Sequence, residues 1–313
     1  MIYMEPLALG WRPLATSWLQ TMPEALATGG GRETLECLFE WCFDPCLDFV
    51  RLQCKQMTPV SPMSHIVSTL GFIEMMVFDK AREEDAMDNR YLKGWSYASL
   101  LFGIIWGIGG CLDFASRIKY DAYVRQLFMN QIEELPVPEC VGGRIDFMMS
   151  ESGLVYDYWF EFKSRGVWRH WNELTRGLNK FEGMEIRDII VPTMDTARYK
   201  YILDTCLTFN RPVNFVGPTG TGKSAYVQEK LIRDIDKEKY TPFFINFSAQ
   251  TSANQVQNLT MSKLDRRRKG VYGLPMQKTA VFFIDDMNMP QKEVYGAQPP
   301  IELLRMFMDH GYW

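Results

Sequence analysis

Histidine and closely paired cysteines are scarce in this sequence, which argues against a metal-binding protein. Only three histidines occur, at positions 65, 170 and 310, far apart in the chain. None of the seven cysteines forms a C-x-x-C pair: Cys37, Cys42, Cys46, Cys54, Cys111, Cys140 and Cys206. Zinc sites are usually built from closely spaced Cys and His ligands. No zinc site is therefore expected, and the odd number of cysteines favours buried, reduced thiols in an intracellular chain.

An excess of basic charge is also lacking. Lysine and arginine number 34 against 38 acidic residues, so the formal net charge is -4 and the pI is about 5.6. Nucleic-acid binding requires a concentrated basic surface. One short cluster is strongly basic, and it consists of Lys263, Arg266, Arg267, Arg268 and Lys269. The cluster is too small to change the balance, so no nucleic-acid partner is expected.

Export and membrane signals are missing as well. The start, MIYMEPLALGW, has no basic segment, apolar stretch or small-residue cleavage site of a secretory signal. The segment 95–112 approaches the length of a membrane span, but it contains four glycines together with Ser96 and Ser99. A buried helix is the favoured interpretation, and no membrane partner is expected. The composition, 47% hydrophobic and 23% charged over 313 residues, is that of a globular chain with room for two modules.

The first half of the chain has the apolar spacing of helices. From about Thr16 to Phe128, apolar residues recur every three or four positions. After Leu127, proline and glycine separate short aromatic runs, which predicts a β-hairpin or small sheet. A domain boundary and a connector follow. A helix is then expected to begin at Asp195 or Thr196 and to continue to Leu207.

The second half alternates short apolar β-rich runs with helical segments. Strands are predicted at 213–216, 242–247 and 281–284, and helices at 224–235 and 253–268. This alternation is typical of a parallel sheet that is covered by helices on both faces. The second half is therefore predicted to be an α/β module.

A phosphate-binding loop connects the first of these strands to its helix. Eight residues match G-x-x-x-x-G-K-[ST] in full: Gly217, Pro218, Thr219, Gly220, Thr221, Gly222, Lys223 and Ser224. Glycines allow successive backbone N–H groups to point at the phosphates, and the helix adds its positive end. The Lys223 ammonium is expected to reach the β- and γ-phosphates, and the Ser224 hydroxyl to bind Mg²⁺. The position between an apolar strand and a helix argues against an accidental glycine-rich turn.

A second motif, the acidic VFFIDDMN, contains the third predicted strand and the two residues that follow its end. Asp285 fits the carboxylate that supports Mg²⁺ in P-loop ATPases. Asp286 stands where many ATPases carry the glutamate that activates water, which makes it the candidate catalytic residue. The alternative is an exposed acidic turn after a core strand. Because Asp is one methylene shorter than Glu, nucleotide binding is a firmer expectation than hydrolysis.

At these residues the sequence resembles a known family. The segments GPTGTGKS, FSAQTSANQVQNLTMSKLDRRRKGVYG, VFFIDDMNMP and EVYGAQPPIELLRMFMDHGYW together resemble the third AAA+ module of dynein heavy chains, most closely those of the axonemal type. This resemblance covers roughly 189–313. Upstream, MIYMEPLALGWRPL, GIIWGIGGCLDFASRIKYD and LVYDYWFEF are similar to the tail and helical lid of the second module.

The resemblance implies a domain organisation. Residues 1–15 would be the last strand, at 1–4, and the tail of a preceding AAA+ core, and 16–135 a helical AAA+ lid. Residues 136–185 would form a hairpin extension and connector, and 186–313 the N-terminal part of the next AAA+ core, with an incomplete parallel sheet. The sensor residue, lid and any arginine finger of that core would follow residue 313. The chain is thus expected to be an internal piece of a larger motor, with its helical half docked against its α/β half.

The resemblance also implies ligands and roles for particular residues. ATP or ADP with Mg²⁺ would bind at Gly217–Ser224, and the backbone of Val191, Pro192 and Thr193 would lie beside adenine unless that segment is a plain linker. Arg117 would be either a lid arginine that faces phosphate or part of a salt bridge within the lid, and Arg305 has no expected catalytic role. The basic cluster would be a solvated helix end or a contact with another module.

Two functions remain open on this basis. The first is a regulatory ATP site, with or without slow hydrolysis, in a microtubule-based motor ring, and the second is a non-hydrolysing structural or regulatory nucleotide module of an AAA+ assembly. The implied partners are other AAA+ modules of the same heavy chain, dynein intermediate and light chains, and microtubules through regions absent here. The implied location is the cytoplasm and cytoskeleton, in the axoneme of a cilium or flagellum.

A GTPase is disfavoured because the N-K-x-D pattern is absent. The 313-residue segment by itself is expected to bind nucleotide weakly.

Overall fold

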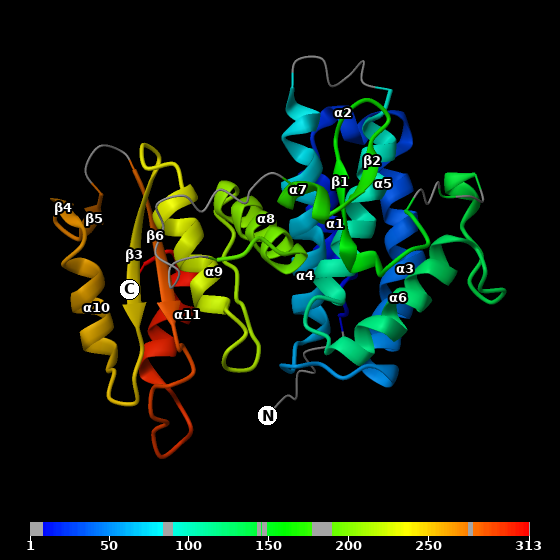
Figure 1. The fold of residues 1–313 in the computed structure, drawn as a ribbon. Helices are drawn as coiled ribbons and strands as arrows, with labels where there is room; N and C mark the ends of the chain where they lie inside the picture. Colours follow the sequence, from blue (N-terminus) through cyan, green and yellow to red (C-terminus); the bar gives the residue numbers. More distant parts are fainter. Residues whose placement is uncertain are drawn as a thin grey trace, which may run out of the picture. The chain divides into compact units, whose positions relative to one another are not determined.

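The computed structural model describes residues 9–83, 90–142, 145, 149–176, 190–274 and 278–312 (Figure 1). Two compact units divide the chain, Met1–Pro218 and Thr219–Trp313. Each unit has its own elements and its own buried core, and each is described by itself below. The predicted strand at 1–4 lies outside the described residues.

Helices dominate the first unit, as the apolar spacing predicts. In chain order they are α1 (Arg12–Gln20), α2 (Glu24–Ala27), η1 (Thr28–Gly30), α3 (Gly31–Gln53), α4 (Pro62–Ile73), η2 (Glu74–Phe78), η3 (Lys80–Arg82), α5 (Leu92–Gly103), η5 (Ile104–Ile108) and α6 (Phe114–Phe128). The central helix α3 is lined by fully buried side chains, among them Leu38, Phe39 and Phe43. The Phe39 and Phe43 rings stack with their centroids 4.6 Å apart. This aromatic stripe anchors α3 in the core.

Two glycines let α4 and the α5–η5 helix approach closely. A Cβ atom on Gly107 would lie 2.5 Å from the Thr69 hydroxyl oxygen, and one on Gly103 would lie 2.8 Å from the Thr69 carbonyl oxygen. In this tight contact the Thr69 hydroxyl donates to the Gly103 carbonyl oxygen over 3.2 Å. Most of the segment 95–112 is thus a buried helix within the unit, as predicted, and the helix ends at Ile108. Across the part of the chain that the structure describes, no helix has the length and apolar character of a membrane span.

A small β-hairpin follows the helices and confirms the prediction made from the aromatic runs. Strands β1 (Tyr158–Glu161) and β2 (Val167–His170) pair antiparallel. The short helices η6 (Glu139–Val141), η7 (Val155–Asp157) and α7 (Asn172–Thr175) flank them, and α8 (Met194–Thr208) comes next. Trp171 is fully buried, and its indole N–H donates to the Tyr156 carbonyl oxygen at 2.8 Å. The Asp157 carboxylate pairs with the Arg198 guanidinium at 3.6 Å, which ties α8 to the hairpin region.

The second unit contains the parallel strands that the sequence predicts. Its elements are α9 (Lys223–Glu229), η9 (Lys230–Asp234), β3 (Tyr240–Asn246), α10 (Ala253–Met261), β4 (Asp265–Arg268), β5 (Val271–Gly273), β6 (Thr279–Asp285) and α11 (Pro299–His310). Strands β3 and β6 run side by side in the same direction, with Asn246 opposite Asp285 at their carboxyl ends (Figure 1). Ile245, Phe247 and Val256 form a buried cluster against residues of β6 and α11. The second unit is thus an α/β module, and the first is mainly helical.

Two predicted secondary-structure segments are wrong. Residues 213–216 form no strand, because a strand requires hydrogen bonds to a neighbour and the described residues place none beside this segment. The helix predicted over 253–268 ends at Met261, and 265–268 instead pairs with β5 across a turn where Gly270 has φ of 74°. The basic cluster is therefore largely an exposed antiparallel hairpin and not a helix end.

The prediction that every cysteine is reduced is also wrong. Cys37 in α3 and Cys140 in η6 form a disulfide, with their Cα atoms 6.9 Å apart. The two residues are 103 positions apart in sequence, and the packing of η6 on α3 brings them together. The other five cysteines are free, and Cys42, Cys46 and Cys206 among them are buried.

Candidate nucleotide site

The phosphate-binding loop holds two glycines in a conformation that other residues rarely adopt. Gly220 has φ of 84° and Gly222 φ of 79°, both left-handed. Gly222 is the residue from which α9 begins, and a Cβ atom there would also approach the Tyr226 ring to 3.1 Å. The left-handed backbone at these two positions therefore favours glycine, which lets the loop lead directly into α9. Much of the loop is exposed, so a ligand can reach it from solvent.

The hydroxyl and the carboxylate predicted to bind magnesium are in direct contact. Ser224, in the first turn of α9, donates its Oγ hydrogen to the Asp285 Oδ1 atom over 2.9 Å. Asp285 is the last residue of β6, and its side chain is brought to this point by the parallel pairing of β6 with β3. The same Oδ1 atom accepts the Asp286 backbone N–H at 3.0 Å. These contacts join the start of α9 to the carboxyl end of the sheet.

Asp286 has an unusual backbone conformation at the candidate catalytic position. Its φ is 51°, in the left-handed region, and its side chain is exposed. Its carbonyl oxygen accepts the Met289 N–H at 2.9 Å, so the strained turn is hydrogen-bonded. Asp tolerates this region better than most residues, and such strain is concentrated at functional sites. Within the phosphate-binding loop, the Lys223 ammonium donates to the Thr221 hydroxyl at 3.3 Å.

A glutamine that sequence reasoning missed holds the segment after Asp286. The Gln298 side-chain amide donates to the carbonyl oxygens of Asn288, at 3.2 Å, and Pro290, at 2.6 Å. Because both acceptors are backbone groups, no side-chain pattern in the sequence could have indicated this role. Gln298 closes the loop that begins with the candidate catalytic residue.

The residues predicted to lie beside adenine, Val191, Pro192 and Thr193, and the lid arginine Arg117 belong to the first unit. Thr193 caps α8, since its hydroxyl accepts the Thr196 N–H at 3.2 Å, and Val191 is exposed. The position of 191–193 beside adenine stays a prediction. The Arg117 guanidinium donates to the Gly110 carbonyl oxygen at 2.9 Å and lies 4.9 Å from the centroid of the Tyr156 ring. Arg117 is thus packed within the helical unit.

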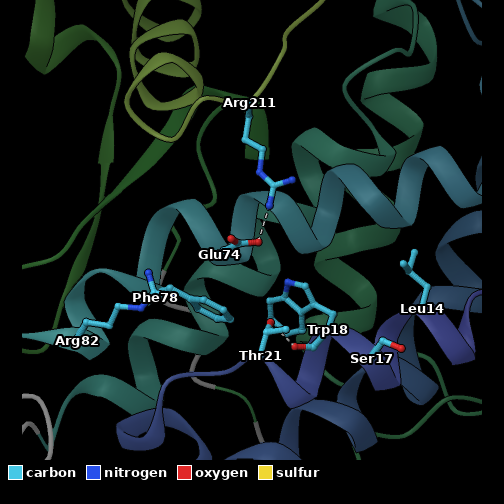
Figure 2. Close-up of a pocket in the computed structure, with 8 residues that line it drawn as sticks. All are labelled: Leu14, Ser17, Trp18, Thr21, Glu74, Phe78, Arg82 and Arg211. Atoms are coloured by element: carbon cyan, nitrogen blue, oxygen red, sulfur yellow. Dashed lines mark hydrogen bonds and ion pairs between the residues drawn. The ribbon is translucent and has the colours of Figure 1, made fainter. Parts of the chain in front are cut away.

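Arg305 and the pocket of the first unit have no contact that implies chemistry. Arg305 pairs with Glu302 on the same exposed face of α11. A shallow pocket opens between α1 and η2 (Figure 2), and it is lined by Leu14, Ser17, Trp18, Thr21, Glu74, Phe78, Arg82 and Arg211. Arg211 and Glu74 at its rim form an ion pair at 2.6 Å. We assign no ligand to this pocket, because its rim charges neutralise each other.

Two protein-family models and several known proteins are similar to this chain. Residues 179–313 match the family model described as the P-loop containing dynein motor region, and residues 35–173 match the dynein heavy chain AAA lid domain. The chain is 46% identical over 316 residues to dynein axonemal heavy chain 12 of Mus musculus, of which it covers 10%. It is 43% identical over 323 residues to dynein axonemal heavy chain 3 of Homo sapiens, of which it covers 8%.

Both alignments include the whole chain, which spans about a tenth or less of the length of these relatives. The lid match lies in the helical unit, and the motor-region match contains the phosphate-binding loop and β6. The order of the two matched domains and the identity over the full chain show that this protein belongs to the dynein heavy chain family.

Proposed function

We propose that this segment binds ATP or ADP with Mg²⁺ and that the site regulates a microtubule-based motor ring. The observation that carries the proposal is the 2.9 Å contact between the Ser224 hydroxyl and the Asp285 carboxylate. Hydroxyl and carboxylate oxygens are the ligands that suit Mg²⁺, and P-loop NTPases hold the ion with this pair. The oxygen donors therefore fit a magnesium nucleotide.

Each residue of the loop has a separate part in this proposal. The backbone N–H groups of Gly217 and Thr219–Gly222 cradle the phosphates, and the Lys223 ammonium neutralises their charge. Ser224 and Asp285 support the metal ion, which supplies charge neutralisation when it is bound. Asp286 orients or deprotonates the attacking water. The segment Val191–Thr193 lies beside the adenine in this scheme.

The regulatory role and the partners rest on the family and on the names of the relatives. Both relatives described above are axonemal heavy chains, which supports an axoneme of a cilium or flagellum as the location. Other AAA+ modules of the same heavy chain, dynein intermediate and light chains, and microtubules are the proposed partners. In such an assembly, nucleotide state at this site would gate a ring whose main hydrolysis occurs elsewhere.

Isothermal titration of the heavy chain segment with Mg-ATP tests the binding proposal. We expect the native sequence to bind Mg-ATP and Lys223→Ala to have an affinity at least about tenfold lower. The reason is that the Lys223 ammonium is the charged side chain of the loop that contacts phosphate. Lys292→Ala, an exposed lysine in the loop after β6, is the control that should bind as the native chain does. Equal affinity of the Lys223→Ala and Lys292→Ala variants would contradict the proposal.

A non-hydrolysing nucleotide module is the second candidate, and the exposed, short side chain of Asp286 favours it. Single-turnover hydrolysis in the full-length heavy chain, with other nucleotide sites inactivated, separates the two. If Asp286 acts on water, Asp286→Asn should slow hydrolysis by about 10²-fold or more. No hydrolysis above background at the native site would support the non-hydrolysing module, whereas a measurable rate that is equal in Asp286→Asn would rule out Asp286 as the base.

A further inference from the structure

The disulfide of the helical unit lies at the protein surface and takes no part in the candidate nucleotide site. Its Cα atoms are 6.9 Å apart, within the ~7 Å that such a bond can span without movement of the backbone. All seven cysteines lie in the described residues, and among them Cys140 alone is exposed, whereas Cys37 is half-buried. Reagents in solvent can therefore reach the bond from the Cys140 side.

Contacts other than the disulfide hold the segment before η6 in place. Trp41, one turn after Cys37 in α3, donates its indole N–H to the Leu135 carbonyl oxygen at 3.2 Å. Val137 is buried, and its N–H donates to the Asn130 Oδ1 atom at 2.9 Å. These contacts would remain after reduction of the bond. The two thiols would then stay close to each other, so that the bond could form again.

The compartment decides whether such a bond is permanent or reversible. Thiol buffers keep most cytosolic cysteines reduced, and the disulfides that occur there are usually transient and catalytic or redox-sensing. The relatives described above are axonemal heavy chains. The cytoskeletal location proposed for this chain therefore favours a reversible bond. Only this choice rests on the proposed location, whereas the pairing of the two cysteines does not.

We propose that Cys37 and Cys140 form a reversible redox site that reacts with small thiols and disulfides of the glutathione type. To close the bond, the exposed Cys140 thiol loses its proton, and the thiolate attacks one sulfur of oxidised glutathione. A mixed disulfide forms at Cys140, and the first glutathione thiolate leaves. The Cys37 thiolate then attacks the Cys140 Sγ atom and displaces the second glutathione.

The reaction balances without any further reagent. The two protein thiols are oxidised to one disulfide, and one oxidised glutathione is reduced to two thiols, which take up the two protons that the cysteines release. Opening is the reverse reaction, in which the thiolate of reduced glutathione attacks the Cys140 Sγ atom and Cys37 leaves.

Closure of the bond restrains a large part of the helical unit. The two cysteines are 103 positions apart, and α4, α5 and α6 lie between them. A cross-link over so long a stretch restricts the unfolded chain and so favours the folded form. Both cysteines lie within residues 35–173, which match the dynein heavy chain AAA lid domain. Oxidation is therefore expected to make local opening of this lid less frequent.

A redox titration of the full-length heavy chain tests whether the bond is reversible. The protein is equilibrated at increasing ratios of oxidised to reduced glutathione, quenched with acid, alkylated and digested, and its peptides are identified by mass spectrometry. We expect a linked Cys37–Cys140 peptide in the oxidising buffers and its decrease, by at least about tenfold, in the reducing ones. Absence of the linked peptide at every ratio, or its persistence at the most reducing ratio, would overturn the inference.

Single substitutions test the order of the two attacks. In Cys37→Ser, Cys140 should accumulate the mixed disulfide with glutathione, because no second thiol resolves it. In Cys140→Ser, the half-buried Cys37 should accumulate at least about tenfold less of it. The matched control is Cys111→Ser, which removes a half-buried cysteine outside the pair and should form the linked peptide as the native chain does. Equal modification of Cys37 and Cys140 would overturn entry at Cys140.

Amide hydrogen exchange of the oxidised and reduced heavy chain tests the restraint on the lid. Reduction should speed exchange in residues 139–142 by at least about tenfold and leave β3 and β6 unchanged. Cys37→Ser should exchange as the reduced native chain does in either buffer. Equal exchange of 139–142 in the two forms would overturn the restraint. These measurements need no nucleotide, so a failure of the segment to bind Mg-ATP would overturn the proposed function and leave the redox site to be decided by its own tests.

Discussion

At the scale of single residues, the contact between Ser224 and Asp285 connects sequence to chemistry. A hydroxyl at the start of α9 and a carboxylate at the end of β6, 61 residues apart, meet at 2.9 Å. The contact depends on both the loop glycines and the parallel pairing of β3 with β6. Such a contact is worth little to stability when its atoms are partly exposed, so its chemistry is the better explanation for the arrangement.

Asp285→Asn tests that explanation. The substitution keeps an oxygen that can accept the Ser224 hydrogen bond but removes the negative charge that supports Mg²⁺. We expect Mg-ATP affinity to fall by about tenfold or more, and affinity measured in EDTA to change little. Asp309→Asn, in the last turn of α11, is the control and should leave both affinities as they are. Equal losses with and without Mg²⁺ would show that the carboxylate has no metal role.

His65 gives the helical unit a dependence on pH. Its side chain is buried, and its Nδ1 atom lies 3.0 Å from the Gly107 carbonyl oxygen. Burial lowers the pKa of His65 below 6.5, although the carbonyl contact partly opposes this. Below pH 6.5, His65 is protonated in the unfolded chain more readily than in the folded chain. The free energy of unfolding is therefore highest above that pH and decreases as the pH falls.

The measurement is the urea midpoint of the helical unit at pH 7.5 and at pH 5.5. We expect a lower midpoint at pH 5.5 for the native sequence and a smaller difference between the two values for His65→Gln. His310→Gln, in the exposed last turn of α11, should retain the native difference. A pH dependence that His65→Gln leaves intact would assign the effect to other groups.

At the scale of elements, the close contact between α4 and η5 depends on Gly107. An added Cβ atom would meet the hydroxyl, backbone nitrogen and Cα atom of Thr69 at 2.5 to 2.8 Å, where the backbone must move. Gly94, in the exposed first turn of α5, has no atom within 4 Å of such a Cβ. The two glycines therefore allow opposite predictions for the same substitution.

Gly107→Ala should destabilise the helical unit by about 1–3 kcal/mol, because it overpacks the helix contact. Gly94→Ala should be neutral or stabilise by up to about 1 kcal/mol, because Ala is the better helix former. Chemical denaturation of the two variants checks both values. A loss in Gly94→Ala as large as that in Gly107→Ala would mean that the helix contact is looser than the structure indicates.

Local patterns in the sequence predict most of these elements, and long-range contacts account for the failures. The helical spacing and the phosphate-loop motif are set by neighbouring residues, so both could be read directly. The strand predicted at 213–216 is wrong, because an apolar run becomes a strand only beside a partner. The basic run 265–268 pairs with β5 through the turn at Gly270, and the Cys37–Cys140 bond joins residues 103 positions apart. Gln298 was missed because its partners are backbone carbonyls.

At the scale of the whole molecule, the two units have cores of very different size. The helical unit buries many large side chains completely, including Phe39, Tyr120 and Trp171. Among the residues of the second unit that the structure describes, fewer large apolar side chains are buried: Val227, Leu231, Ile235, Tyr240, Ile245, Phe247, Val256 and Leu274. Apolar burial is the main favourable contribution to folding, and local stability follows the amount of it in each part of a chain. The second unit should therefore open more readily than the first.

Amide hydrogen exchange tests this difference and the proposed ligand together. Without nucleotide, amides of β3 and β6 should exchange at least about tenfold faster than those of α4 and α5. Mg-ATP at 100 times its Kd stabilises the form that binds it by about 2.7 kcal/mol, which corresponds to up to about 100-fold slower exchange in β6 and α9. The helices α4 and α5 should be unaffected, and Lys223→Ala should remove the effect. Equal protection of the two units without nucleotide would contradict the predicted difference in stability, and slowing by Mg-ATP that is uniform along the chain would contradict the proposed phosphate and metal contacts of Lys223, Ser224 and Asp285.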